Sequence, residues 1–252
     1  MAWNKDSIVH LLEVDSTNRY VRDEAAALWQ NRGISDFAVV TAEHQTAGRG
    51  QRGNTWNSNA GENLLFSLLV RPGETLEVSK QFLLSQAVAL SIHDAMKCYG
   101  VDTRLKWPND IYAGNRKLAG ILLELDYSGA FVEQAIIGIG LNVNQENFPP
   151  MDRKPVSMKM LREHDFILDD VLATILDLFE HYYTEMRFGN RDAIAAKYKR
   201  VLLGMDERHT FIDCNGRFGA VIQGVESDGR LLLLRCDGSI ARYAFKEVEM
   251  VL

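Results

Sequence analysis

The chain has little cysteine and little proline. The scarcity of cysteine argues against a disulfide-stabilised fold and against a metal site built on cysteine. Its 252 residues include five prolines and three cysteines, Cys98, Cys214 and Cys236. Because the cysteines are odd in number and scattered, they do not indicate a disulfide framework. No CxxC pair or His/Cys cluster indicates a metal site built by the protein itself. We therefore expect a reduced, cytoplasmic protein.

Long apolar runs and a strong positive charge are also missing. No apolar run is long enough to span a bilayer, and the first residues lack the apolar core of a signal peptide. The formal net charge is −6 and there is no arginine-rich tail, which argues against a general nucleic-acid binder because such binding depends on phosphate neutralisation. The chain is long enough for one sizeable core and a small second module.

Hydrophobic periodicity predicts an α+β protein with a mostly antiparallel sheet, because the helices segregate from the hairpins. The expected helices are Ser16 to about Trp29, Gln81–Tyr99 and Phe166–Phe188. The expected strands are Phe37–Ala42, Asn63–Val70, Thr103–Tyr112, Lys117–Leu125 and Gln134–Asn144.

The spacing of turn signals in the sequence changes near Gly204. Turn signals recur closely after it, at Asn215-Gly216, Asp228-Gly229 and Asp237-Gly238, with short strand-like runs between them. This pattern predicts a small β-barrel or sandwich that follows a linker. We therefore divide the chain into a first domain of residues 1–203 and a second of residues 204–252.

A glycine-rich basic loop, Gly48-Arg49-Gly50-Gln51-Arg52-Gly53, is the first candidate binding element. Glycine lets the backbone approach a ligand, backbone N–H groups form an anion cradle, and arginine adds bidentate contacts. The spacing fits neither a Walker loop nor a dinucleotide fingerprint. Trp56, just beyond the loop, would either stack on a base or enter the core.

A second basic element follows, with Lys106-Trp107-Pro108-Asn109-Asp110 on one strand and Lys117-Leu118-Ala119-Gly120 on the next. A two-residue turn at Gly114-Asn115 would pair Tyr112 with Lys117 and Asp110 with Ala119. Lys106, Asp110 and Lys117 would then share one face. Pro108 is expected to deform the first strand and turn Asn109 aside. The alternative is a plain surface salt-bridge ladder.

Glycine, which has no side chain, recurs on one face of the strand expected over Gln134–Asn144. Gly138, Gly140 and Asn142 alternate there with apolar residues. Two such glycines indicate close approach by a ligand or equally by another part of the protein. Asn142 could read the edge of an adenine ring. Ser16 and Thr17 are either helix caps or ligands for a carbonyl or ureido group.

Nucleophilic catalysis is not indicated, because there is no GxSxG elbow and no cysteine in a motif that recruits a histidine. His44 lies next to the glycine loop and is the one histidine of interest. We expect the remaining histidines at the surface or at an interface: His10, His93, His164, His181 and His209.

Taken in order, these motifs resemble the biotin protein ligases over roughly residues 10 to 145. The resemblance rests on Ser16-Thr17-Asn18, on Gln45 with the glycine loop and Trp56, on the two segments of the basic hairpin, and on Gly138-Ile139-Gly140-Leu141-Asn142. It implies a catalytic domain like that of class II aminoacyl-tRNA synthetases, with a mostly antiparallel or mixed sheet and helices on one side. It also implies a small C-terminal SH3-like β-barrel.

The resemblance implies a two-step reaction with ATP and Mg²⁺. Biotin's carboxylate attacks the α-phosphorus to form biotinyl-5′-AMP, and a lysine of a biotin carboxyl carrier protein then takes the biotinyl group. The magnesium would arrive as Mg-ATP, with no protein ligand assigned. No helix-turn-helix segment precedes Ser16, so no DNA partner is expected, and no membrane partner either. Relatives include monomers and dimers, which leaves a homodimer open.

The resemblance also implies residue roles. Biotin would contact Ser16, Thr17, Asn18, Gln45, Gly48, Arg49, Gly50, Gln51, Lys117, Gly120 and Gly138. ATP or the adenylate would contact Arg49, Arg52, Trp56, Lys106, Asn109 and Asn142. The catalytic residues would be Lys117, Arg49, Lys106 and Asp110, with Lys117 as the main electrostatic catalyst.

Two features depart from or compete with this interpretation. Many relatives have a basic residue where this chain has Gln51, so Arg52 would take over the phosphate contact or the adenylate would be held more loosely. Met158-Lys159-Met160 resembles a biotin-accepting sequence, but it precedes a helix in a loop instead of forming an exposed hairpin tip, and we interpret it as coincidence.

Two other functions stay open at this point. A lipoate or octanoate ligase shares the fold and the adenylate chemistry but needs an apolar channel, whereas Ser16, Thr17 and Gln45 favour biotin. A non-catalytic sensor of biotin or its adenylate would bind the same ligands without labelling a carrier.

Overall fold

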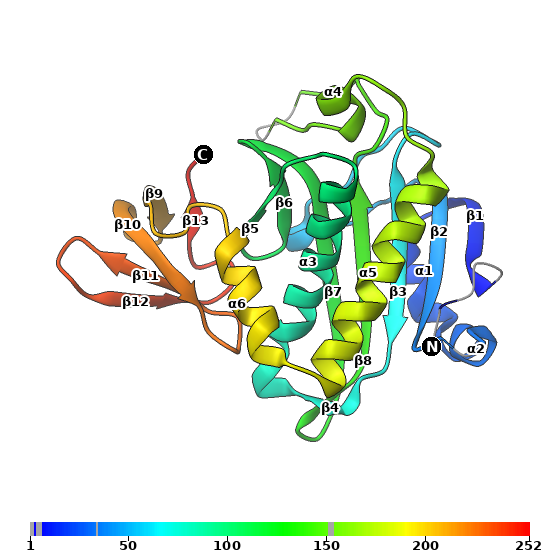
Figure 1. Cartoon of the computed structure of the whole chain (residues 1–252), viewed down its shortest axis with the longest axis horizontal. Helices are drawn as coiled ribbons and strands as arrows, with labels where there is room; N and C mark the ends of the chain where they lie inside the picture. The colour runs from blue at the N-terminus through cyan, green and yellow to red at the C-terminus, as the bar shows by residue number, and fades with distance from the viewer. Residues whose placement is uncertain (1–2, 4–6, 34, 151–153) are drawn as a thin grey trace.

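The protein forms two β-sheets (Figure 1). The computed structural model describes residues 3, 7–33, 35–150 and 154–252, and the side chain of Arg52 also lies outside the description. The larger sheet has eight strands in the order β1-β2-β3-β8-β7-β6-β5, with β4 beside β8. The pair β1–β2 is parallel and the other pairs are antiparallel. The predicted α+β class with a mostly antiparallel sheet is confirmed.

The strands of this sheet are β1 (Val9–Val14), β2 (Phe37–Gln45), β3 (Leu64–Val70), β4 (Gly73–Glu77), β5 (Arg104–Lys106), β6 (Asp110–Ala113), β7 (Arg116–Ser128) and β8 (Phe131–Leu141). The α-helices are α1 (Thr17–Asp23), α2 (Ala25–Asn31), α3 (Phe82–Cys98), α4 (Met158–Arg162), α5 (Leu168–Phe188) and α6 (Arg191–Val201). Within the described residues, no helix has the length and apolarity needed to cross a membrane.

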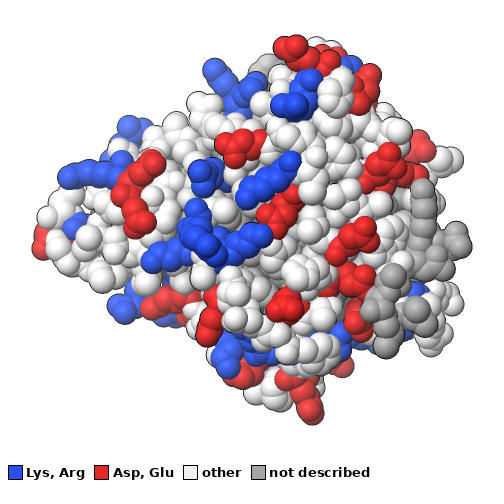
Figure 2. Space-filling model, in the orientation of Figure 1, with Lys and Arg blue, Asp and Glu red and all other residues white. Residues whose placement is uncertain are grey.

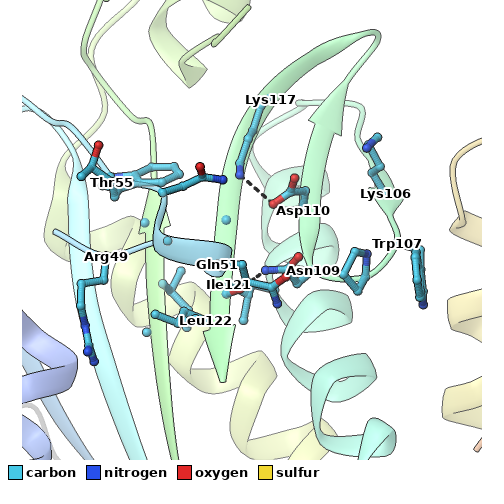
Figure 3. Close-up of a pocket in the computed structure, with 18 of the residues that line it drawn as sticks. Arg49, Gln51, Thr55, Lys106, Trp107, Asn109, Asp110, Lys117, Ile121 and Leu122 are labelled. Atoms are coloured by element: carbon cyan, nitrogen blue, oxygen red, sulfur yellow. Dashed lines mark hydrogen bonds and ion pairs between the residues drawn. The ribbon is translucent and has the colours of Figure 1, made fainter. Parts of the chain in front are cut away.

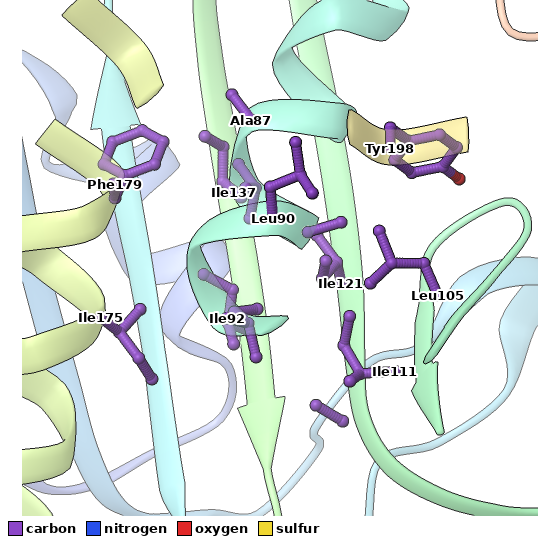
Figure 4. Close-up of a cluster of buried hydrophobic side chains, with 14 of the residues drawn as sticks. Ala87, Leu90, Ile92, Leu105, Ile111, Ile121, Ile137, Ile175, Phe179 and Tyr198 are labelled. Carbon is purple, nitrogen blue, oxygen red and sulfur yellow. The ribbon is translucent and has the colours of Figure 1, made fainter. Parts of the chain in front are cut away.

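Strand β3 is buried along its whole length because helices cover both faces of the sheet near it. Helices α3 and α5 lie on one face (Figure 1), where their side chains meet those of the sheet, such as Leu90 and Ile137, in the main core (Figure 4). Phe66 and Leu68 of β3 enter the same core. The small helices α1 and α2 cover part of the other face, where Val21 and Leu28 pack near Leu69. Each fully buried aliphatic side chain in these layers contributes about 2 kcal/mol through the hydrophobic effect.

Basic side chains gather over α6 on the face shown in Figure 2. One of them, Lys197, is bound to the Asp94 carboxylate of α3 at 2.5 Å and to the Tyr182 hydroxyl of α5. The contacts of Lys197 with Asp94 and Tyr182 therefore connect α6 to α3 and α5, the two helices that cover the main core.

Two predicted elements are wrong in their continuity. The helix expected from Ser16 to Trp29 is broken at Glu24 into α1 and α2. The strand expected over Thr103–Tyr112 is a hairpin, in which β5 turns at a cis Trp107–Pro108 bond and returns as β6. Pro108 thus occupies a turn, where the sheet requires no N–H donor. The sequence patterns did not predict strands β1 and β4 or helix α6.

The register of the next hairpin was predicted in part. Tyr112 lies opposite Lys117, as expected. A bulge between Ile111 and Tyr112 then places Asp110 opposite Gly120 instead of Ala119. Because a bulge adds one residue to one strand, the simple alternation from the turn fails beyond it.

The smaller sheet follows residue 203 and is antiparallel throughout, in the order β12-β11-β10-β9-β13. Its strands are β9 (Arg208–Asp213), β10 (Gly216–Val225), β11 (Leu231–Arg235), β12 (Ile240–Tyr243) and β13 (Glu249–Met250). The three predicted turn signals lie between successive strands from β9 to β12. The domain boundary at residues 203 and 204 stays a prediction.

The two sheets are joined through the β5–β6 turn. The indole Nε1 of Trp107 donates to the carbonyl of Gly229 at 2.9 Å, and its ring lies 5.4 Å from that of Phe245. Phe245 also packs against Phe82 of α3. A residue of the basic hairpin motif therefore anchors the smaller sheet.

Candidate active site

A cavity of about 360 Å³ lies where the glycine loop, the basic hairpin and the smaller sheet meet (Figure 3). It is lined by these residues from the sequence-predicted site: Ser16, Thr17, Asn18, Gln45, Arg49, Gly50, Gln51, Trp56, Lys106, Asn109, Asp110, Lys117, Gly120 and Gly138. The smaller sheet contributes residues that the sequence did not indicate: Phe211, Ile222, Leu231, Val248, Glu249 and Met250. One cavity thus gathers segments that are far apart in the chain.

A buried polar network forms one end of the cavity. The Thr17 backbone N–H and hydroxyl both donate to Oε1 of Gln45, at 2.8 and 3.1 Å. The Oγ atom of Ser67 lies 2.7 Å from both Thr17 Oγ1 and Asn18 Oδ1. Ser16 occupies the N-cap position of α1, but its side chain makes no capping hydrogen bond. These contacts fix an array of hydroxyl and amide groups that suits a polar ligand.

Ser67 is a supporting residue that the sequence analysis missed. It is fully buried on β3, behind Thr17 and Asn18. A lone serine in the apolar run from Leu64 to Val70 was the available signal, since a buried hydroxyl needs a hydrogen-bond partner.

The bare glycine positions make room for side chains of the protein. A Cβ atom at Gly138 would lie 2.3 Å from Asn18 Oδ1, and one at Gly140 would lie 2.4 Å from the Trp56 ring. A Cβ at Gly120 would approach Lys117 Nζ and the same ring at 3.1 Å. The glycines therefore let α1 and the indole lie directly on strands β7 and β8.

The sequence left open whether Trp56 enters the core or stacks on a base, and the structure gives it features of both. Its indole is half-buried at the cavity wall, over Gly140 and 5.6 Å from Lys117 Nζ. Its Nε1 atom is buried without a hydrogen-bond partner. A ring with one face at a cavity can both pack on the sheet and stack against a planar ligand.

The basic hairpin brings Lys117 to Asp110, with Lys106 opposite Asp110 on the neighbouring strand. The predicted alternation does not produce this arrangement, because β5 and β6 are separate strands and a bulge shifts the register. Lys117 Nζ lies 2.7 Å from Asp110 Oδ1 (Figure 3). Lys106 is directly opposite Asp110 on β5 and is buried, with its ammonium 5.7 Å from the Tyr112 ring. The ion-pair ladder and the cavity wall are therefore the same feature.

The glycine loop is a closed turn held by its own backbone. Gly50 N donates to Asn54 O at 2.7 Å, and Trp56 N donates to Gly48 O at 2.9 Å, around a 3₁₀ turn at Gln51–Gly53. The Arg49 guanidinium leaves the loop to meet Glu124 of β7 at 2.6 Å. Gly48 packs against the Trp56 backbone and does not line the cavity. The predicted Arg52 contact lies outside the described residues.

The two asparagines expected at adenine have different environments. Asn109 lines the cavity, and its amide donates to the Ile121 carbonyl. Asn142 follows the end of β8, is buried, and donates to the Val156 carbonyl at 3.1 Å. Asn142 is not among the described residues that line the cavity, and its predicted contact with adenine stays a prediction.

Three other candidates lie away from the cavity. His44 contacts Glu13 at 3.0 Å. His93, expected at the surface, is buried on α3 against the Thr103 hydroxyl. Lys159 lies in α4 instead of in a loop and pairs with Glu146 and Asp165, each at 3.0 Å.

A metal site built by the protein is not present in the described part of the chain, where no group of three or more His, Cys, Asp or Glu side chains could hold an ion. The cavity carboxylate of Asp110 is paired with Lys117. These donors do not form a cage for Mg²⁺, which prefers several oxygen ligands and water.

Comparisons with known proteins agree on one family. A model of the "Biotin/lipoate A/B protein ligase family" matches residues 13–142. The "Bifunctional ligase/repressor BirA" of Bacillus subtilis is 32% identical over 223 residues, which cover 87% of this chain and 68% of that protein. The "Biotin--[acetyl-CoA-carboxylase] ligase" of Paracoccus denitrificans is 32% identical over 235 residues, with 88% and 92% covered.

Solved structures agree with the sequence comparisons. The "Biotin protein ligase from Aquifex aeolicus in complex with biotin and ATP" superposes with a TM-score of 0.79 at 25% identity, and the match covers 97% of this chain and 98% of that one. The chain therefore belongs to the biotin/lipoate A/B protein ligase family.

Proposed function

We propose that this chain is a biotin–[acetyl-CoA-carboxylase] ligase. It activates biotin with ATP and transfers the biotinyl group to a lysine of a biotin carboxyl carrier protein. The observation that carries the proposal is the cavity itself, because it joins a polar end at Thr17 and Gln45 to the cations Arg49 and Lys117. Relatives named as biotin ligases, and a neighbour solved with biotin and ATP, support it.

In the first step an oxygen of the biotin carboxylate attacks the α-phosphorus of ATP, and the bond to pyrophosphate breaks. Two anions must approach each other, so fixed cations that match the developing charge lower the barrier. Lys117 and Arg49 supply this charge from β7 and from the glycine loop. Asp110 is paired with Lys117 and sets its position, and Lys106 lies opposite Asp110 on β5.

In the second step the amine of the carrier lysine attacks the acyl carbon, the bond to AMP breaks, and the amine loses a proton. The mixed anhydride is sensitive to hydrolysis, so the loop from Gly48 to Trp56 excludes water from it. Trp56 and Asn109 contact the adenine, and Arg52 contacts a phosphate. Asn142, whose amide nitrogen secures the segment after β8, would contact the adenine through its amide oxygen.

Magnesium enters this proposal as part of Mg-ATP, where it neutralises charge on the phosphates. Because no described group of side chains forms a cage for it, we assign it no protein ligand. The free and exposed thiols of Cys98, Cys214 and Cys236 fit a reducing compartment. We therefore place the enzyme in the cytoplasm.

The choice of biotin over lipoate rests on the polar end of the cavity. A ureido ring has donors and acceptors that can use the remaining hydrogen-bonding capacity of Thr17, Asn18 and Gln45, whereas an apolar chain would leave that capacity unused. We expect pyrophosphate release with ATP and biotin, and none above background with lipoate or octanoate. The reverse preference would overturn the proposed substrate. A non-catalytic sensor would bind biotin without releasing pyrophosphate.

A further inference from the structure

Glu124 on β7 lies between two arginines from different parts of the chain. Its Oε1 atom meets Arg49 Nη2 at 2.6 Å, and its Oε2 atom meets Arg22 Nη2 at 3.4 Å. Arg22, from α1, also binds Asp126 through Nη1 at 3.3 Å. The Glu124 side chain is 23% exposed, while those of Arg49 and Arg22 are 49% and 42% exposed. Glu124 is therefore the least exposed member of a four-residue ion-pair cluster.

The Arg49–Glu124 contact connects the glycine loop to the sheet. The backbone hydrogen bonds of Gly50 and Asn54 join parts of the loop to each other, and Arg49 is bridged to Thr55 within the loop. The side chains of Arg49 and Trp56 reach out of the loop to β7 and β8. An ionic contact at one end and an aromatic contact at the other thus hold the loop across the cavity.

We propose that Glu124 is a positioning residue that anchors the glycine loop through Arg49. Arg22 gives Glu124 a second cationic partner and so helps to fix the carboxylate that Arg49 binds. The anchoring itself follows from the contacts above. Its effect on the adenylate rests on the proposed function.

The first test is limited trypsin digestion of the full chain with no nucleotide or acid added. Cleavage after Arg49 requires its guanidinium to leave Glu124, so the rate at this bond reports the contact. We expect Glu124→Gln to increase this cleavage rate about two- to fivefold, the range that a partly exposed ion pair supports. Asp126→Asn is the matched control, because Asp126 is two residues along β7 and contacts Arg22 without contacting Arg49. It should cleave at the wild-type rate.

Equal cleavage rates in wild type and Glu124→Gln would overturn the proposal, as would an equal increase in both variants, since that would indicate general loosening of β7. If Glu124→Gln does not fold, Glu124→Asp gives the same comparison, because the shorter side chain withdraws the carboxylate from Arg49. This digestion uses no substrate, so its result does not depend on whether the chain ligates biotin.

The second test measures retention of the product of the first step. After formation of biotinyl-5′-AMP, Glu124→Gln should release it about two- to fivefold faster than wild type. Because Arg49 also supplies charge in the first step, pyrophosphate release should slow as well, by a similar factor. Asp126→Asn should match wild type in both rates. Unchanged release of the adenylate in Glu124→Gln, or an equal increase in both variants, would contradict a positioning role.

Discussion

Lys117 is the side chain on which the proposed chemistry depends most, and it is held by Asp110 at 2.7 Å. The Lys117 side chain is 26% exposed and lines the cavity, while the Asp110 side chain is 10% exposed. A cation held in this way is preorganised, because little movement is needed when charge develops on the α-phosphate. The pair explains why both residues belong to one site although they lie on different strands.

Replacing this cation should stop the first step without unfolding the protein. We expect Lys117→Ala to lower biotin-dependent pyrophosphate release at least about 100-fold, the typical cost of losing one electrostatic group. The variant should keep its secondary structure by circular dichroism, with unfolding free energy reduced by about 1–2 kcal/mol because Asp110 loses a partner. Turnover near the wild-type rate would show that Lys117 is not the catalyst.

His93 is a residue whose protonation opposes folding. Its ring is buried on α3, and Nδ1 lies 2.8 Å from the Thr103 hydroxyl. Burial, assisted by the charge of Lys97, lowers the pKa of His93 from 6.5 to about 4, although Asp94 opposes the shift. The folded protein therefore keeps the ring neutral at pH values where the unfolded chain binds a proton.

The sign of the resulting pH effect is fixed by this lowered pKa. The stability that neutral His93 contributes is complete above pH 6.5 and is lost as the pH falls toward 4. Between pH 7.5 and 5, wild type should lose about 2 kcal/mol of unfolding free energy through this group. His93→Gln should lack this part of the slope in urea unfolding. Parallel slopes for the two proteins would contradict the assignment.

At the scale of elements, the β5–β6 turn connects the site to the smaller sheet. Trp107→Phe keeps an aromatic ring beside Phe245 but removes the Nε1 donor to the Gly229 carbonyl. We expect a loss of about 1–2 kcal/mol in unfolding free energy, because a buried carbonyl loses its hydrogen bond. The Michaelis constant for ATP should rise, since Asn109 and Asp110 belong to the same turn. An unchanged unfolding midpoint would contradict this anchoring role.

Elements with a long, regular pattern could be predicted from the sequence. Strand β3 is an uninterrupted apolar run, and helices α3 and α5 repeat apolar residues over 17 and 21 residues. The failures are short or irregular elements. The break at Glu24 has no glycine or proline to mark it, and β1 is an edge strand with mixed burial. Such elements are set by tertiary packing more than by local preference.

The site could be predicted where several motifs point to one ligand, and less well where only contacts reveal a role. Arg49, Lys117 and Gly138 share the cavity, as the motifs implied. Asn142 continues the alternation of the glycine strand in sequence, but β8 ends at Leu141 and the side chain turns to Val156. Glu124 has no motif, because an acidic residue on a strand gives no sign of the arginine that it meets.

The whole molecule adds a wall to the cavity that no local pattern indicates. Residues of the smaller sheet, including Phe211 and Val248, line the same cavity as the glycine loop. Trp107 fixes this sheet against the hairpin. The proposed activity therefore depends on both sheets, although the family model covers only residues 13–142 of the larger part.

The most direct measurement is a labelling assay with the full chain, ATP, labelled biotin and a biotin carboxyl carrier domain. We expect label on one carrier lysine, we expect labelling to require ATP, and we expect Lys117→Ala to abolish it. The label should be absent from this chain's own Lys159, which α4 holds between two carboxylates. A carrier that stays unlabelled while the chain binds biotin and ATP would contradict the proposed ligase activity.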